Sequence, residues 1–270
     1  MSGKTLISIC VFTIMVTPIW HANVADAQLV ERGLVSYWAF DKDTIEGGIL
    51  KDVWGNNDGK IYGDPKVING KVKESLEFDG VDDYVEVPDN DSLDMGKSDF
   101  SICAWIKTEA KEVFDFMAVI FGDGDMMGGG DPSYSILLFS KTMPAFELYD
   151  LKTYLDRDGH NSQKPVNDGK YYHLAWVFDH DKDCSIYING KFDIKYDISM
   201  IGDLNNNQDS MIGNQPTRDF FFPGVIDELV IYNRTLSEAE VAKNFDAKGL
   251  SVEPMVRVTL TWGEIKKSTF

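Results

Sequence analysis

Gly224-Val-Ile-Asp-Glu-Leu-Val-Ile-Tyr-Asn233 is the stretch that decides the fold, and Arg234-Thr-Leu-Ser-Glu-Ala-Glu-Val241 continues it. The first segment is apolar and rich in β-branched residues, which predicts a strand. Strict alternation would place Asp227 on one face of this strand and Glu228 on the other. A carboxylate within so apolar a run needs a partner, because an uncompensated charge is costly to bury. The rest of the chain has to supply that partner.

The second segment predicts one short helix. Ser237 is placed as its N-cap and Glu240 stands three residues later, which is the capping-box pattern. Leu236 and Val241 are spaced as a hydrophobic staple, and Gly249 can terminate the element. We expect this helix to cover one end of a β-sandwich.

Short alternating runs account for most of the remaining chain. No helical period is sustained before residue 236, and Asn189-Gly190 is a strong hairpin signal. About a dozen short strands separated by turns predict an all-β, two-sheet antiparallel sandwich. The predicted strands occupy residues 33–41, 60–63, 75–79, 83–88, 99–107, 116–121, 133–140, 145–151, 170–178, 184–188, 191–198 and 210–213.

The N-terminus has the features of a secretory signal peptide. Lys4 precedes an apolar run from Leu6 to Trp20, and Ala25-Asp26-Ala27 is an A-x-A cleavage site. An uncleaved membrane anchor is the alternative, although the run is too short to span a bilayer comfortably. We therefore expect a signal peptide at 1–27, a sandwich domain at 28–249, a tail at 250–270, and a secreted or periplasmic protein without a membrane span.

The formal net charge of −18 restricts the partners. So acidic a chain repels nucleic acid and anionic membranes, whereas divalent cations and neutral ligands such as sugars remain compatible with it. Solubility alone is an alternative explanation for much of this charge.

Two cysteines remain after the predicted cleavage, Cys103 and Cys184. An exported pair can form a disulfide. Both nevertheless lie in strand-like runs, where a buried reduced cysteine is common. Cys184 shares a predicted face with Ile186 and Ile188, which favours the core position.

Six motifs in order resemble those of the bacterial laminin G-like, concanavalin A-like jelly-roll domain. The resemblance covers about residues 29–246 and implies a jelly-roll sandwich with one short C-terminal helix. The motifs are Tyr37-Trp-Ala-Phe-Asp41, Leu76-Glu-Phe-Asp-Gly-Val-Asp-Asp-Tyr-Val85, Phe100-Ser-Ile-Cys-Ala-Trp-Ile106, Lys170-Tyr-Tyr-His-Leu-Ala-Trp176, Ile186-Tyr-Ile-Asn-Gly-Lys191 and Gly224 to Ser237.

The resemblance also implies a structural Ca²⁺ beside the first and last strands. Matched by position, its ligands would be the side chains of Asp227 and Asp41 and the carbonyl of Gly80. In the alternative, Asp227 accepts hydrogen bonds from loop amides, and the acids around Gly80 only form a turn. A second acidic segment, 122–131, lacks the ligand spacing of an EF-hand, and we expect a solvated loop there rather than a metal site.

Candidate sugar ligands are aromatic residues beside Asn, Asp or Arg on loops, since carbohydrate sites combine an apolar platform with polar groups. The candidates are Trp54, Asn56, Asp131, Tyr134, Arg157, Arg218 and Phe221. For the run Phe220-Phe221-Phe222, plugging one end of the sandwich is the alternative.

Catalysis has weaker support. Related glucanases place carboxylates in an E-x-D-x-x-E strand, and the nearest match, Glu77 to Asp82, is interrupted by Gly80. The pair Asp227-Glu228 is expected to point to opposite faces. The sequence therefore favours an exported, non-catalytic module that binds carbohydrate or an extracellular protein surface. A polysaccharide hydrolase or lyase is the first alternative, and a structural adhesion module is the second.

Overall fold

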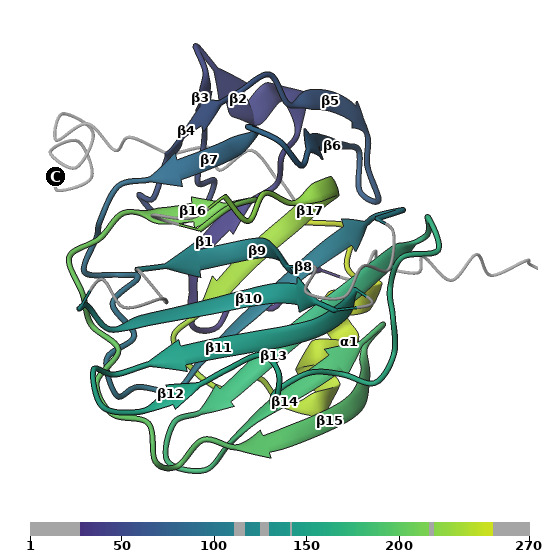
Figure 1. Cartoon of the computed structure of the whole chain (residues 1–270). Helices are drawn as coiled ribbons and strands as arrows, with labels where there is room; N and C mark the ends of the chain where they lie inside the picture. Colours follow the sequence, from purple (N-terminus) through teal and green to yellow (C-terminus); the bar gives the residue numbers. More distant parts are fainter. Residues whose placement is uncertain (1–27, 111–116, 125–129, 141, 216–218, 251–270) are drawn as a thin grey trace, which may run out of the picture.

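The computed structural model describes residues 28–110, 117–124, 130–140, 142–215 and 219–250. Two antiparallel sheets face each other in these residues, with one α-helix outside them (Figure 1). The prediction of an all-β jelly-roll sandwich is confirmed. The predicted signal peptide and nearly all of the predicted tail lie outside the described residues.

The nine-stranded sheet lies at the front of Figure 1 and contains the middle of the chain. In spatial order its strands are β12 (Tyr154–Leu155), β11 (Met143–Tyr149), β10 (Ser133–Phe139), β9 (Met117–Asp123), β16 (Ser210–Ile212), β7 (Tyr84–Val87), β4 (Gly59–Tyr62), β3 (Ile49–Leu50) and β2 (Ile45–Glu46).

The eight-stranded sheet lies behind it and brings the first and last strands together. Its order is β15 (Lys191–Asp197), β14 (Asp183–Ile188), β13 (Tyr171–Asp179), β8 (Phe100–Lys107), β17 (Pro223–Tyr232), β6 (Glu74–Asp79) and β5 (Lys66–Asn69), and β1 (Leu34–Trp38) also pairs with β17. A 3₁₀ turn, η1 (Lys42–Thr44), follows β1. β17, which contains the apolar stretch from Gly224 to Tyr232, pairs with β1, β6 and β8 and is the closing strand of the sandwich.

The main core fills the space between the sheets. The inward residues of β8 are those predicted, Phe100, Ile102, Ala104 and Ile106, and all four are buried in it. Alternate residues of the same strand, such as Cys103, face outward. This period-2 alternation explains why so many strands were recognisable in the sequence.

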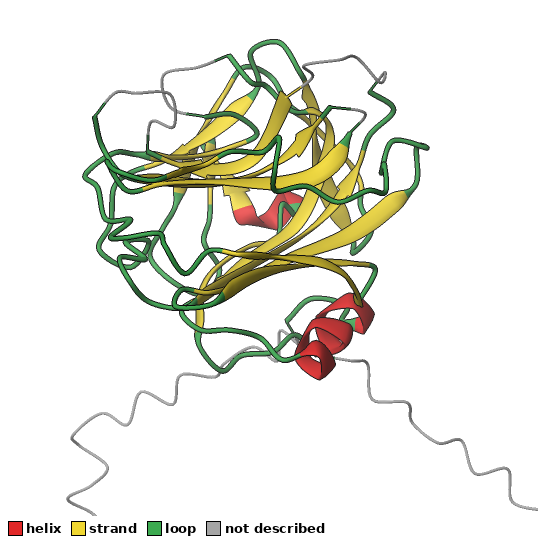
Figure 2. Cartoon of the chain, turned by 60° about the horizontal axis from the view of Figure 1, so that its bottom comes forward, coloured by secondary structure: helices red, strands yellow, loops and turns green. Residues whose placement is uncertain are grey.

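The helix α1 (Glu238–Asp246) begins with the predicted capping box between Ser237 and Glu240. It does not cover an end of the sandwich, as we expected. It packs on the outer face of the eight-stranded sheet, where Leu236 and Val241 join a second apolar cluster (Figure 2). This location leaves the other half of that face open for the turns and loops that surround β17.

The two cysteines are reduced, and both are buried. Cys184 belongs to the core between the sheets, whereas Cys103 belongs to the cluster beneath α1. The two thiols therefore lie on opposite faces of one sheet, and a disulfide between them is geometrically impossible. Of the two alternatives drawn from the sequence, the core position is the correct one.

A β-bulge interrupts β17 at the acidic pair. Asp227 is paired with Trp105 and Val230 with Cys103, so two residues of β17 oppose one residue of β8. Glu228 takes the left-handed conformation, with φ of 53°. The extra residue shifts the alternation, so that Ile226 and Leu229 both face the core. Asp227 and Glu228 consequently share the outer face, and our expectation of opposite faces is wrong.

Within the described residues, no helix combines the length and the apolar character that a membrane crossing requires.

Candidate functional site

A pocket of about 480 Å³ opens on the outer face beside this bulge. We call it the Trp54 pocket. It lies between β1, the loop after β3, the turn between β5 and β6, and the segment that follows α1. Its lining residues are Glu31, Tyr37, Ala39, Asp41, Asp43, Thr44, Val53, Trp54, Val72, Lys73, Glu228, Lys248, Gly249 and Leu250.

Trp54 presents a fixed ring to this pocket. Its indole Nε1 donates to the carbonyl of Leu34 at 2.9 Å, which orients the side chain. The residue is nevertheless 43% exposed, so a face of the ring remains available. A tryptophan whose polar atom is already satisfied, and whose apolar surface stays open, is suited to stacking against a ligand.

Asp52 organises the loop that carries Trp54. Its buried carboxylate accepts hydrogen bonds from the backbone N–H groups of Tyr37, Trp54, Gly55 and Asn57, at 2.9–3.1 Å. Gly55 is required by close packing, since a Cβ there would lie 2.4 Å from the carbonyl oxygen of Val35. This single carboxylate therefore ties the loop to β1 and sets the position of the tryptophan before any ligand arrives.

Glu228 lies at the inner wall of the pocket. Its Oε2 accepts a hydrogen bond from the Tyr37 hydroxyl at 2.7 Å, while Oε1 is buried without a hydrogen-bond partner. Burial, with a smaller contribution from neighbouring Asp227, raises the pKa of Glu228 to about 8. Strained backbone and an unpartnered buried oxygen are features that cluster at functional sites.

Asp227 is enclosed by the turn between β5 and β6. Its Oδ2 accepts from the backbone N–H groups of Lys71 and Val72, at 2.7 and 3.1 Å. Burial raises its pKa to about 7. Nearby, the buried Asp41 forms a 2.9 Å ion pair with Lys73. The partners that Asp227 required are thus loop amides, which is the alternative that the sequence left open.

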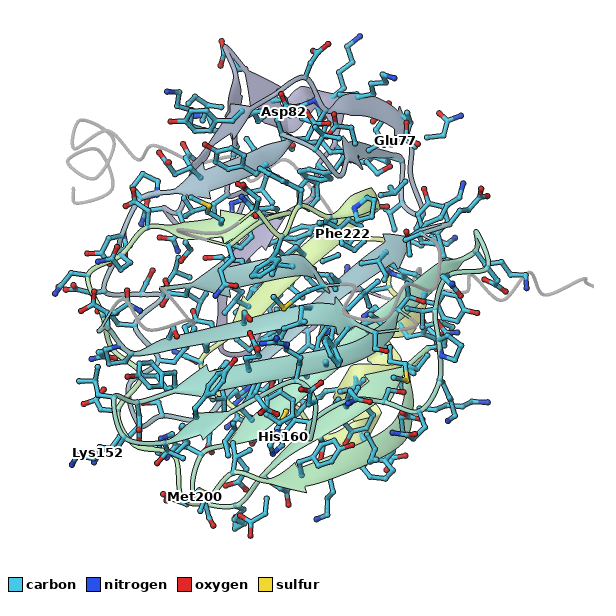
Figure 3. The ribbon with its side chains drawn as sticks, viewed as in Figure 1. Glu77, Asp82, Lys152, His160, Met200 and Phe222 are labelled. Carbon is cyan, nitrogen blue, oxygen red and sulfur yellow. The ribbon has the colours of Figure 1, made fainter. Side chains whose placement is uncertain are left out.

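The predicted calcium ligands do not form one site. Gly80 packs against Pro223 at the start of β17, four residues along the strand from Asp227. Figure 3 labels Glu77 and Asp82, which flank Gly80, at the upper end of the sandwich. Asp41 and Asp227 do lie close together, but amides and Lys73 occupy three of their four carboxylate oxygens. Ca²⁺ takes six to eight oxygen ligands, and the predicted set does not fit it.

The acidic residues around Gly80 form a turn, which was the alternative to a role in calcium binding. Three carboxylates, those of Asp79, Asp82 and Asp83, come within 4.8 Å of one another. Asp79 Oδ1 accepts from three successive backbone N–H groups, and Asp83 accepts from Asp79 and Asp64. Their oxygens stabilise the connection between β6 and β7.

The remaining ligand candidates are scattered. Asn56 is exposed in the loop of Trp54 but does not line the pocket. Asp131 accepts a hydrogen bond from Gln208. Phe221 is half-buried against Tyr84, on the nine-stranded sheet. Arg218 lies outside the described residues.

Two candidates have structural roles, which corrects our prediction for them. Tyr134 is fully buried in the core, and its hydroxyl donates to the carbonyl of Leu93. Arg157 forms an ion pair with the fully buried Glu147 on β11. The prediction of a solvated acidic loop at 122–131 is also wrong for its first two residues, because Gly122 and Asp123 end β9. Asp123 is buried, and Ser210 and Asn206 donate to its carboxylate.

Sequence reasoning missed Asp52, Tyr37 and Glu228. Asp52 could have been found, since an Asp that precedes a Gly-Asn turn commonly accepts hydrogen bonds from the next backbone amides. Glu228 could not, because nothing in an apolar strand reveals which residue is the extra one in a bulge.

Two antiparallel sheets that pack face to face, with one short helix outside them, define a jelly-roll sandwich of the lectin type. The Trp54 pocket lies on the outer face of the eight-stranded sheet. A family model described as the concanavalin A-like lectin/glucanases superfamily matches residues 79–242. That span is more than half of the chain, and the protein belongs to this superfamily.

Individual relatives are distant. Paraclostridial mosquitocidal protein 1 of Paraclostridium bifermentans is 24% identical over 216 residues, which make up 75% of this chain and 17% of that protein. The crystal structure of its binding domain has a TM-score of 0.63 at 19% identity, covering 79% of this chain and 52% of the domain.

Two further solved structures have the same architecture. Domain 4 of AbnA, an extracellular arabinanase of Geobacillus stearothermophilus solved with arabinotriose, has a TM-score of 0.60 at 20% identity, covering 78% of this chain and 97% of the domain. The binding domain of botulinum neurotoxin DC, solved with SialylT, has a TM-score of 0.60 at 16% identity, covering 79% and 51% respectively. At these identities the likeness establishes the fold.

Proposed function

We propose that this protein is a non-catalytic binding module that recognises carbohydrate in the Trp54 pocket. The observation that carries the proposal is an oriented, exposed indole face in a pocket whose lining also includes the carboxyl groups of Asp43 and Glu228. The apolar face of a pyranose ring stacks on an indole, while its hydroxyl groups need polar partners.

The pocket offers those partners at fixed positions. Glu228 is held by Tyr37, and Asp43 and Lys73 line the same pocket. Asp52 holds the loop of Trp54, so little conformational freedom is lost when a ligand binds. Such preorganisation contributes to affinity by lowering the entropic cost of association.

The distant relatives support this proposal by analogy. Domain 4 of AbnA was solved with an arabinose oligosaccharide, and a neurotoxin binding domain with SialylT. The same neurotoxin domain was also solved with rat synaptotagmin II, a protein, so this fold serves both kinds of recognition.

A glycan array followed by calorimetry tests the proposal. The wild-type protein is expected to bind at least one class of glycan on the array, and Trp54→Ala is expected to abolish this binding. Phe192→Ala is the matched control, because Phe192 is a comparably exposed aromatic residue on β15, away from the pocket. Glycan binding that survives in Trp54→Ala would contradict this site, and binding to proteins alone would favour an adhesion module.

We further propose that the protein is exported by cleavage after Ala27. The apolar run and the Ala25-Asp26-Ala27 site support this. N-terminal sequencing of the mature protein from cell fractions should find Gln28 as the first residue. A retained Met1 in the membrane fraction would indicate an anchor instead.

Glycoside hydrolysis is the second candidate, and the bulge is the observation that favours it. Asp227 and Glu228 share a face, and both have raised pKa values, as a general acid requires. Of this pair, however, only Glu228 lines the pocket. Hydrolysis needs a second carboxyl group on the other side of the bond, which Glu31 or Asp43 would have to provide, because Asp41 is engaged by Lys73. Release of reducing ends from a bound glycan that stops in Glu228→Gln would establish the enzyme and overturn the non-catalytic proposal.

A further inference from the structure

We propose that a second pocket, next to the Trp54 pocket, binds an anionic group of the same glycan through Lys71, with Lys248 beside it. The anionic group is a carboxylate or a sulfate ester. The inference rests on the proposed function and names its substrate class, an acidic glycan. It follows from the position of the second pocket, from the charges that line it and from the way in which Lys71 is held.

The second pocket, which we call the Lys71 pocket, has a volume of about 510 Å³. It lies between the turn that joins β5 to β6 and the C-terminal end of α1, and the residues that matter in its lining are Lys71, Val72, Lys73, Phe245, Asp246 and Lys248. Val72, Lys73 and Lys248 also line the Trp54 pocket, so the two pockets are direct neighbours. A glycan that stacks one sugar on Trp54 can therefore place the next sugar in the Lys71 pocket.

The Lys71 pocket is basic, although the protein as a whole is acidic. Three ammonium groups line it against one carboxyl group, that of Asp246, whereas the formal net charge of the chain is −18. Lys73 is neutralised by its ion pair with Asp41, and Lys71 and Lys248 are the other two cations of the lining. Both of these side chains are exposed, so a ligand can reach them. An anionic group therefore improves the charge balance of this pocket.

Lys71 is positioned before a ligand arrives. Its backbone N–H donates to Asp227 Oδ2 at 2.7 Å, and its ammonium nitrogen lies 4.4 Å from the centroid of the Trp105 ring. Because Trp105 is buried, this cation–π contact holds the charge against a fixed ring. In the part of the chain that the structure describes, no carboxylate forms an ion pair with Lys71. Its charge is consequently held in place and open to a ligand.

The lysines of the turn are not explained by the helix. The dipole of a helix favours cations at its C-terminal end, and Lys243 already lies in the last turn of α1. Lys71 and Lys73, in contrast, belong to the turn between β5 and β6. Val72 and Phe245 add carbon surface to the pocket, against which a sugar ring gains apolar contact and a free inorganic anion gains nothing. The pocket thus suits an anionic sugar.

Calorimetry with two matched pairs of tetrasaccharides tests the inference. One pair is tetragalacturonate and its methyl ester, and the other is the tetrasaccharide of κ-carrageenan and its desulfated form. We expect the acid of at least one pair to bind about fivefold more tightly than its neutral form, from the usual strength of exposed ion pairs. The pair that shows the preference distinguishes a carboxylate from a sulfate ester. General attraction cannot produce this result, because so acidic a protein repels anions.

Two matched variants locate the charge that is responsible. Lys71→Met should abolish the preference and leave the affinity for the neutral form unchanged, because methionine keeps the apolar contact with Trp105 and loses the charge. Lys60→Met is the control and should keep the preference. The ammonium group of Lys60 also lies 4.4 Å from an aromatic centroid, that of Tyr62, but Lys60 belongs to β4 of the other sheet.

The remaining outcomes separate the two proposals. Neutral forms that bind as tightly as the acids, with binding lost in Trp54→Ala, would overturn the acidic assignment and leave carbohydrate binding in the Trp54 pocket intact. A preference that survives in Lys71→Met, or that disappears equally in Lys60→Met, would also overturn the assignment. Acids that bind Trp54→Ala as tightly as the wild type would show that the two pockets do not share one glycan. Failure of all four oligosaccharides to bind would overturn the inference, whereas the glycan array decides the proposed function separately.

Discussion

Single carboxylates perform quite different tasks in this protein, and their surroundings decide which. Asp52 is buried and accepts four backbone N–H groups, so it acts as a fixed anchor for a loop. Glu228 is buried beside the Trp54 pocket, with one oxygen bound to Tyr37 and the other unpartnered. Asp123 is buried between a hydroxyl and an amide, and it has no contact with the pocket.

Replacement of Asp52 tests its anchoring role. Asp52→Ala leaves four backbone donors without their acceptor, and we expect a loss of stability of about 2–4 kcal/mol in chemical denaturation. The loop should also loosen, so that acrylamide quenches the fluorescence of Trp54 more strongly and the affinity for glycan falls. Asp181→Ala, at a side chain that is 96% exposed, should change neither quantity. An unaltered Trp54 environment in Asp52→Ala would mean that packing alone holds the loop.

Asp123 should make stability depend on pH. Burial raises its pKa from the ordinary 3.8 to about 7. The folded protein therefore keeps a proton that the unfolded chain loses between about pH 4 and pH 7. This contribution is complete below pH 4 and decreases as pH rises, by about 1.4 kcal/mol per pH unit.

The variant Asp123→Asn should remove this contribution, because an amide can still accept from Asn206 and donate to Ser210. The slope that Asp227 and Glu228 contribute through their raised pKa values should remain. Denaturant melts of both proteins at pH 4.5, 5.5 and 6.5 measure the difference. Parallel pH profiles for the wild type and Asp123→Asn would show that Asp123 is ionised throughout this range.

The bulge in β17 is the element that builds the pocket. A regular strand would have turned Glu228 toward the core, whereas one extra residue brings it to the outer face next to Tyr37. The left-handed backbone at Glu228 carries a strain of about 1–3 kcal/mol. The two apolar clusters on either side of this sheet stabilise the fold against that strain.

Deletion of Glu228 should therefore be tolerated. Without it, Ile226 and Leu229 still face inward, and Asp227 and Val230 still face outward, in a regular ladder. We expect a folded protein whose melting temperature lies within a few degrees of the wild type and whose affinity for glycan is reduced. Deletion of Val230 is the matched control, since it would exchange the faces of Ile231 and Tyr232 and should prevent folding. Loss of folding on deletion of Glu228 would show that the bulge is required by the sandwich itself.

At the scale of the whole molecule, the acidic groups are distributed over separate structures. The Asp79 turn lies at one end of the sandwich, and Asp227 and Asp41 lie beside the pocket. Each group is largely satisfied by amides or by a lysine of the chain. The charge of −18 is therefore not evidence of a shared metal centre.

Metal removal tests this conclusion. We expect the melting temperature to be the same in excess EDTA and in millimolar CaCl₂, because Lys73 and the amides of the turn occupy the carboxylates that a cation would use. A site filled at about 100 times its dissociation constant would add about 2.7 kcal/mol, which a melt would detect. A calcium-dependent rise that is lost in Asp227→Ala would restore the calcium prediction.

The sequence by itself determined the sandwich, most of its strands and the capped helix, and it favoured a core position for Cys184. These are consequences of local alternation and of capping chemistry, which depend on neighbouring residues only. It also identified Trp54 as a candidate ligand-binding residue, because an aromatic side chain in a Gly-Asn loop is difficult to bury. Only the tertiary structure decided which face of the sheet the acidic pair Asp227-Glu228 occupies. A bulge in β17 is set by its register against β8, and no local pattern contains that register. For the same reason, the separation of Gly80 from Asp227 and the burial of Tyr134 became visible only once distant strands were paired.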